Sequence, residues 1–182
     1  MPHLQCDDIV TSRLILIAIT PETIQSEKIG DNRLGELIEC AIPANWPPTD
    51  WEPHVFDFFL ALFDQYPDQI GWHRYVALPS DGSRTLIGTV GGGGFIKPEA
   101  PHEAEFGYSV LPQFEGRGFT TEAAKAMIEF FRGHERINSL IAHTFPSIPA
   151  SIRVMEKCGM TYDGEGAEAG TIRYRLQLRP PK

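Results

Sequence analysis

The chain has 182 residues, of which 42% are hydrophobic and 22% charged, a composition that fits one globular core and excludes a disordered protein. Its net charge is −8, and residues 1–100 carry all of it, with six Lys or Arg against fourteen Asp or Glu. Because no basic cluster is present, nucleic-acid binding is excluded. The acidic half is explained either by solubility or by a cationic partner.

The N-terminal ten residues contain Asp7 and Asp8 where a secretory signal needs positive charge, and no apolar run is long enough to span a membrane. Cys6, Cys40 and Cys158 are odd in number and widely spaced, which argues against a disulfide framework and a zinc site. We therefore expect a cytoplasmic protein with a single domain, residues 1–182, and no metal centre.

The first half of the chain predicts a strand, helices and a hairpin. Thr20, Pro21 and Glu22 supply an N-cap, a proline at the first helical position and an acidic first turn. Four prolines and two tryptophans within residues 42–53 forbid a continuous helix and predict an aromatic loop. The expected elements are a strand (11–18), helices (from 21, 31–41 and 54–66) and two strands (75–78 and 86–90) joined by a turn at 80–83.

Four glycines at residues 91–94 follow, and they indicate close backbone packing, with ligand contact as the alternative. The second half then alternates strands and helices. We expect a strand (103–110), a helix (120–131), a strand (138–144), a short helix (149–158) and two closing strands (160–162 and 171–178).

The loop between residues 110 and 120 carries the chemical signal. Gly116 and Gly118 allow successive backbone N–H groups to point inward, and the helix that follows adds its positive end, so the loop suits a pyrophosphate. Two glycines before a helix are weak evidence alone. A dinucleotide fold would need a later acidic residue and a P-loop would need Gly-Lys-Ser/Thr, and neither follows this loop.

The hexapeptide Gln113-Phe114-Glu115-Gly116-Arg117-Gly118 resembles the Gln/Arg-x-x-Gly-x-Gly/Ala acetyl-CoA signature of the GNAT superfamily. Residues 104–110 and 150–160 resemble the branch that contains the ribosomal-protein N-terminal alanine acetyltransferases, and the similarity covers residues 84–162. The resemblance implies a mixed α/β (α+β) sheet, splayed between its fourth and fifth strands and flanked by helices. Acetyl-CoA would be the co-substrate.

The implied activity is N-acetyl transfer to a primary amine, either a protein N-terminus or a small molecule, and such enzymes are often homodimers. The alternative is a non-catalytic acyl-CoA-binding module. The resemblance places pantetheine along the backbone of Ser109, Val110 and Leu111, and the thioester near Ser151. Around the pyrophosphate it places Gln113, Gly116, Arg117, Gly118, Phe119 and Thr120.

Acetyl transfer needs a group that takes the amine proton and a group that stabilises the leaving thiolate. Glu105 is the first candidate base and Glu103, on the same strand face, is its rival. His143 is a further usable base, or else a structural histidine. Many relatives carry a tyrosine acid where this chain has Met155, so Ser151 is the nearest hydroxyl, unless it only caps its helix.

Two further features concern the ligands. Ile148 stands where this branch usually has an asparagine that contacts pantetheine. The candidates for an acceptor wall are Trp46, Trp51, Trp72 and His54, although tryptophan is also a common core residue.

Overall fold

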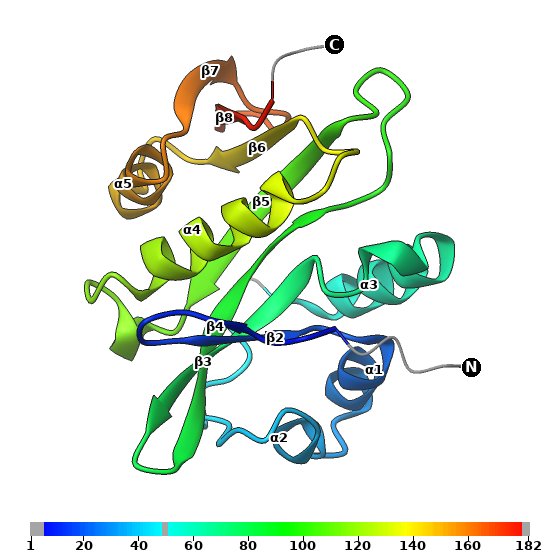
Figure 1. The fold of residues 1–182 in the computed structure, drawn as a ribbon, viewed down its shortest axis with the longest axis vertical. Helices are drawn as coiled ribbons and strands as arrows, with labels where there is room; N and C mark the ends of the chain where they lie inside the picture. The colour runs from blue at the N-terminus through cyan, green and yellow to red at the C-terminus, as the bar shows by residue number, and fades with distance from the viewer. Residues whose placement is uncertain (1–5, 49–50, 180–182) are drawn as a thin grey trace.

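The computed structural model describes residues 6–48 and 51–179, and within them eight strands form one sheet in the order β1-β2-β3-β4-β5-β6-β8-β7 (Figure 1). Only β5 and β6 are parallel neighbours. The strands are β1 (Ile9–Val10), β2 (Ile15–Ala18), β3 (His73–Ser80), β4 (Ser83–Gly93), β5 (Glu103–Val110), β6 (Ser139–Thr144), β7 (Thr161–Glu165) and β8 (Ile172–Gln177). The predicted mixed sheet is confirmed.

Helices cover both faces of this sheet. They are α1 (Pro21–Ile29), α2 (Leu34–Leu37), α3 (Pro53–Gln65), α4 (Phe119–Arg132) and α5 (Pro149–Lys157), with single 3₁₀ turns η1 (Pro67–Gln69) and η2 (Pro112–Phe114). In Figure 1, α4 crosses in front of β5, whereas α3 lies at the right, α1 below it and α2 at the bottom of the view. Each face therefore has its own core.

The core under α4 and α5 is built on Phe131, Met127 and Phe106, which are at most 3% exposed. The core under α1, α2 and α3 is built on Leu62, Phe63 and Tyr75, again at most 3% exposed. The amphipathic pattern of residues 120–131 produces the first of these layers, because its apolar stripe has the helical period.

Two predicted elements are corrected by the structure. The strand expected over residues 11–18 begins only at Ile15, because residues 11–13 turn away to bind the Glu122 side chain, and the separate strand β1 precedes it. The splayed pair is the predicted one, residues 103–110 and 138–144, and the added strand β1 changes only its numbering, to β5 and β6. The helix expected over residues 31–41 shortens to α2, and Asn32 and Glu39, which flank it, have positive φ of 60° and 53°.

The predicted start of α1 and the packing role of the glycines are confirmed. The Thr20 hydroxyl accepts from the Thr23 backbone N–H at 3.3 Å, and the Thr23 hydroxyl accepts from the Thr20 N–H at 3.0 Å. A Cβ on Gly91 would lie 2.5 Å from the His73 Cα. No helix among residues 6–48 and 51–179 combines the length and the apolar character needed to cross a membrane.

Candidate active site

The sheet forks between β5 and β6. Their parallel pairing covers three rows only, from Glu103 with Ser139 to Glu105 with Ile141. Beyond that row β5 remains paired with β4 as far as Val110, and β6 remains paired with β8 as far as Thr144. The inner edges of the two strands therefore face each other without a ladder, which suits an extended ligand that pairs with strand backbone.

The fork opens toward the glycine loop before α4. Gly116 and Gly118 have φ of 71° and 79°, a left-handed conformation that glycine adopts without strain. Gly118 is the N-cap of α4 and offers no side-chain acceptor, so the first N–H groups of the helix remain available. This arrangement is the anion cradle that the loop sequence predicted.

Two arginines stand beside this cradle. The Arg13 Nη1 donates to the Arg117 carbonyl at 3.0 Å, and the Cζ atoms of Arg13 and Arg117 lie 4.7 and 4.9 Å from the centre of the Phe119 ring. An open groove of about 560 Å³ runs between residues 10–15 and the start of α4 and is lined by both arginines. The sequence pattern did not identify Arg13, because it is distant from the loop along the chain.

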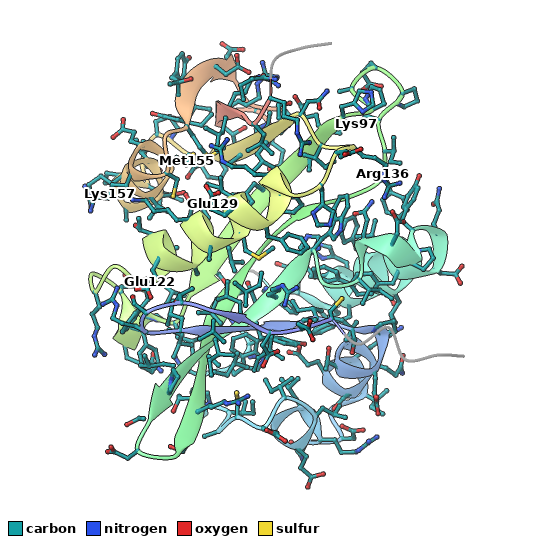
Figure 2. All side chains as sticks on the ribbon, viewed as in Figure 1. Lys97, Glu122, Glu129, Arg136, Met155 and Lys157 are labelled. Carbon is teal, nitrogen blue, oxygen red and sulfur yellow. The ribbon has the colours of Figure 1, made fainter. Side chains whose placement is uncertain are left out.

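The position of Arg13 depends on Glu122 in the first turn of α4, which Figure 2 labels. This carboxylate accepts from the hydroxyls of Thr11 and Ser12 at 2.7 and 2.9 Å and from the Arg13 Nε at 2.7 Å. Burial alone would raise the pKa of Glu122, but these hydrogen bonds outweigh it and lower the pKa to about 2. The carboxylate therefore stays charged and holds residues 11–13 against the cradle.

The remaining predicted cofactor residues are placed unequally. Ser109 and Val110 lie on the forked part of β5, and the Ser109 hydroxyl is 2.9 Å from that of Thr89. Leu111 is 1% exposed and its N–H donates to the Ile87 carbonyl at 2.8 Å, so it has no free backbone N–H for pantetheine. Phe119 is buried at the first turn of α4, and Thr120 is half-buried beside it.

Gln113 points away from the cradle. Its side-chain amide exchanges two hydrogen bonds of 3.0 Å with that of Asn45, which belongs to the aromatic loop. Residues 49 and 50 of that loop lie outside the described residues. The signature loop is thereby joined directly to the segment that was expected to bind the acceptor.

On the α5 side of the fork, Ser151 meets a hydroxyl that the sequence did not identify. The Tyr108 hydroxyl donates to the Ser151 carbonyl at 2.9 Å and lies 3.2 Å from the Ser151 Oγ. Burial raises the pKa of Tyr108 to about 12, although its hydrogen bond to Ser151 opposes the rise. Strand alternation could have found Tyr108, because it follows the buried Phe106 on the same face.

The neighbours of Ser151 clarify the departures from the family pattern. Met155 is 1% exposed and packs into the core between α5 and the sheet, as Figure 2 shows, so it offers nothing to the thioester. Ile148 is the N-cap of α5 and is 45% exposed. The Ser151 hydroxyl forms no capping hydrogen bond at this end, which disfavours the purely structural alternative for that residue.

The two candidate carboxylates have different partners. Glu103 forms an ion pair with Arg175, which also binds Asp163 at 2.8 Å, so its charge is already neutralised. Glu105 accepts instead from the His143 ring, with 3.0 Å between Oε1 and Nδ1. Glu105 is 54% exposed in this pair and His143 only 15%. Of the two, Glu105 is the carboxylate that is not bound to an arginine, and it remains accessible to a ligand.

Glu105 and Ser109 lie on the same face of β5, and the residue between them on that face is a glycine, which leaves an open floor without a side chain. Gly107 lies between them, and a Cβ added there would meet nothing within 4 Å. Its neighbour on β4 is Gly91. Beyond Gly91 stands His73, whose pKa burial lowers to about 4, so that its ring is neutral. The space above Gly107, beside the fork, is therefore open.

The three tryptophans do not form one wall. Trp46 and Trp51 pack on the core under α1, α2 and α3, and the Trp46 Nε1 donates to the Glu27 carboxylate at 2.8 Å. Trp72 is 4% exposed and packs against Phe131 on the other face of the sheet. It therefore fills the core. His54 is an exposed residue at the start of α3.

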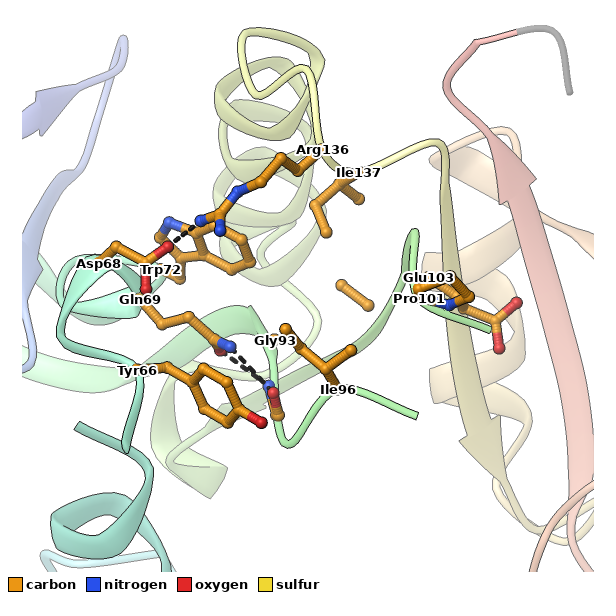
Figure 3. A pocket seen from close by; sticks show the side chains of 12 residues that line it. Tyr66, Asp68, Gln69, Trp72, Gly93, Ile96, Pro101, Glu103, Arg136 and Ile137 are labelled. Carbon is orange, nitrogen blue, oxygen red and sulfur yellow. Dashed lines mark hydrogen bonds and ion pairs between the residues drawn. The ribbon is translucent and has the colours of Figure 1, made fainter. Parts of the chain in front are cut away.

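Trp72 also borders the cavity in Figure 3, which has a volume of about 40 Å³. An ion pair between Asp68 and Arg136 crosses its edge, and Gln69 donates to the Gly94 carbonyl at 2.9 Å beneath it. A cavity of this size holds a few waters at most. It begins at Glu103 and Ala104, before the fork, and is too small for a substrate.

Known acetyltransferases resemble this chain in sequence. A family model described as an acetyltransferase (GNAT) domain matches residues 13–161. The uncharacterized N-acetyltransferase YnaD of Bacillus subtilis is 33% identical over 70 residues, which are 38% of this chain and 41% of YnaD. The FsC-acetyl coenzyme A-N(2)-transacetylase of Aspergillus fumigatus is 32% identical over 82 residues, 40% of this chain and 35% of that protein. The match thus spans less than half the length of both relatives.

Solved structures resemble the chain over nearly its whole length. An acetyltransferase from Agrobacterium tumefaciens is 22% identical, with 96% of each chain covered and a TM-score of 0.63. A ribosomal-protein acetyltransferase, RimL, in complex with coenzyme A is 16% identical, with 94% of this chain and 98% of RimL covered and a TM-score of 0.61. A dodecameric spermidine N-acetyltransferase from Vibrio cholerae is 19% identical, with coverage of 92% and 95% and a TM-score of 0.57. At these identities the likeness establishes the fold.

Proposed function

Because the chain belongs to the GNAT acetyltransferase family, we propose that it transfers an acetyl group from acetyl-CoA to a primary amine. The observation that carries the proposal is the fork between β5 and β6 leading directly into the Gly116 and Gly118 cradle. A pantetheine chain in the fork and a pyrophosphate on the cradle would satisfy both at once.

In this proposal the cofactor follows the residues predicted from the signature, with two changes. Ser109 and Val110 pair with pantetheine, while Leu111 contributes no N–H because it is bonded to Ile87. Arg13 joins Arg117 beside the phosphates, since both guanidinium groups line the adjacent groove. Gln113 joins the signature loop to the aromatic loop through Asn45 and does not contact the cofactor.

The chemistry uses both faces of β5. The amine, arriving over Gly107, attacks the thioester carbonyl carbon, and collapse of the tetrahedral intermediate breaks the C–S bond and releases the thiolate. Glu105 and His143 lie on the acceptor face to take the amine proton. Ser151 and Tyr108 lie on the other face, where the Ser151 hydroxyl, or the Tyr108 hydroxyl once it turns from the Ser151 carbonyl, donates a hydrogen bond to the thiolate.

The acceptor would carry a positive charge before it reacts. The acidic first hundred residues include the helices around the acceptor side, which favours the approach of an ammonium group. Both a protein N-terminus and a small-molecule amine meet this requirement. Of the alternatives, a non-catalytic acyl-CoA-binding module would not need the paired side chains of Glu105 and His143. Homodimer formation and a cytoplasmic location remain predictions.

The proposal is tested by thiol release from acetyl-CoA against a panel of amines that includes a polyamine and peptides with N-terminal alanine. We expect release that depends on the amine, together with an acetylated product of the matching mass. Gly116→Asp is the control, because it adds bulk and negative charge to the cradle and should abolish release. Release that is independent of every amine, or unchanged in the variant, would contradict the proposal.

A further inference from the structure

We infer that the proton lost by the acceptor amine is taken by His143 Nε2, and that Glu105 is the positioning residue that holds the imidazole for this step. The inference rests on the proposed function and assigns the proton within the Glu105 and His143 pair. Four features of the pair carry it.

The first feature is the place of the pair in the fork. Glu105 stands in the last row in which β5 and β6 are paired, opposite Ile141. His143 is two residues further along β6, on the same face and already beyond the pairing. The hydrogen bond between them therefore crosses the vertex of the fork, beside the floor at Gly107 where the amine would arrive.

The second feature is the direction of the hydrogen bond. An ionised carboxylate can only accept, so Nδ1 must be the protonated nitrogen when it bonds to the Glu105 Oε1 at 3.0 Å. The neutral ring then carries its lone pair on Nε2. One nitrogen is thus fixed as a donor to Glu105, and the other is left as the proton acceptor.

The third feature is the set of charges around the ring. Arg173 is the cross-strand neighbour of His143 on β8, but its guanidinium is bound to the Asp163 carboxylate of β7 at 2.9 Å. Arg175, two residues further along β8, is paired with Glu103, so these two charges neutralise each other. Of the described groups, Glu105 is therefore the charged group that contacts the ring directly.

The fourth feature is how firmly the ring is held. The His143 side chain is 15% exposed, and a Cβ placed on Gly166 would lie 3.1 Å from its Cδ2, so the turn between β7 and β8 covers that edge. An imidazole accepts and returns a proton close to neutral pH more readily than a carboxylate does. The proton passes from the amine nitrogen to Nε2 as the C–N bond forms, and then from the imidazolium to solvent.

The test compares pH profiles of kcat/KM for the parent, His143→Asn and Glu105→Gln. Asparagine is the matched substitution, because its side-chain amide can donate to Glu105 as Nδ1 does but has no proton acceptor in place of Nε2. Each pH profile is measured with two acceptor amines of different pKa. The limb that reflects protonation of the amine moves along the pH axis when the acceptor is changed, whereas the limb that reflects the enzyme stays in place.

We expect His143→Asn to lower kcat/KM at least tenfold at neutral pH and to lose the limb that is independent of the acceptor. Glu105→Gln should keep that limb and lower kcat/KM by a smaller factor, because the ring is no longer held by the carboxylate. If His143→Asn keeps the limb and Glu105→Gln loses it, the carboxylate is the base and the inference is wrong.

A measurement without turnover gives a second readout. Nitrogen NMR of the labelled imidazole should show the tautomer with the proton on Nδ1 in the parent, and a mixture of tautomers in Glu105→Gln. The tautomer with the proton on Nε2 in the parent would overturn the inference. Failure of the parent to release thiol with any amine would instead overturn the proposed function itself, and these two failures are seen in different experiments.

Discussion

The side-chain amides of Gln113 and Asn45 exchange two hydrogen bonds of 3.0 Å across 68 residues of sequence. Gln113 belongs to the acetyl-CoA signature and Asn45 to the aromatic loop that we expect to bind the acceptor. The pair therefore joins the signature loop to the aromatic loop, and Trp46 of that loop is bonded separately to Glu27.

Asn45→Ala should act on the acceptor more than on the cofactor. The loop loses its bond to Gln113, so we expect the KM for the amine to rise about three- to tenfold, as for the loss of one or two neutral hydrogen bonds. The Kd for acetyl-CoA, measured by calorimetry, should change by less than about threefold. An effect on acetyl-CoA equal to that of Gln113→Ala would show that the link serves the cofactor instead.

Glu122→Gln should destabilise the protein by about 1.5–3 kcal/mol, because charge-assisted hydrogen bonds to residues 11–13 are lost. Its counterpart Glu129→Gln, on the same helix, removes only an exposed pair with Arg132 and should change the free energy of unfolding by less than about 0.5 kcal/mol. Denaturant unfolding of the three proteins makes the comparison.

The contribution of Glu122 also depends on pH. Its pKa in the folded protein, about 2, is below the ordinary value of 4.5, so the stabilisation is present above pH 4.5 and is lost as the pH falls toward about 2. The difference in free energy of unfolding between parent and Glu122→Gln should therefore shrink over this range. A difference that stays constant from neutral pH to about pH 2 would contradict the assignment.

Gly107→Val and Gly91→Ala should separate function from folding. The space above Gly107 is open, so valine there should leave the midpoint of thermal unfolding nearly unchanged but lower kcat/KM at least tenfold by covering the floor. A Cβ at Gly91 would be 2.5 Å from the His73 Cα, so even alanine should destabilise the sheet, by about 1–3 kcal/mol. Full activity of Gly107→Val would place the acceptor elsewhere.

Tyr108→Phe should lower kcat without weakening acetyl-CoA binding. The substitution keeps the ring in the core and removes only the hydroxyl that meets Ser151. We expect a loss of about ten- to a hundredfold, the range for removing one donor near a developing charge. Ser151→Ala and the double variant of Tyr108 and Ser151 complete a double-mutant cycle. Strict additivity of the two losses in activation free energy, derived from kcat, would show that the hydroxyls act separately.

The sequence predicted those parts of the site that depend on residues close together in the chain. The amphipathic period of residues 120–131, the glycines at 116 and 118 and the alternation along residues 103–110 each depend on neighbours a few positions away, and each was found in the structure. The contacts that were missed join distant segments: Tyr108 with Ser151 across 43 residues, and Thr11 with Glu122 across 111. No local period encodes them.

Trp72 illustrates the same limit. An aromatic residue before a strand fits both a substrate wall and a core, and only the packing of α4 across the sheet decides that it contacts Phe131. Likewise, Glu103 and Glu105 are equivalent by strand alternation, and the difference between them comes from Arg175 on β8 and His143 on β6.

Binding of acetyl-CoA by the fork and the glycine cradle together is measured by calorimetric titration of the parent beside Gly116→Asp. We expect one molecule of acetyl-CoA bound per chain by the parent and no measurable binding by the variant, with both proteins unfolding at similar temperatures. Absence of binding by the parent, or equal binding by a folded Gly116→Asp, would contradict it.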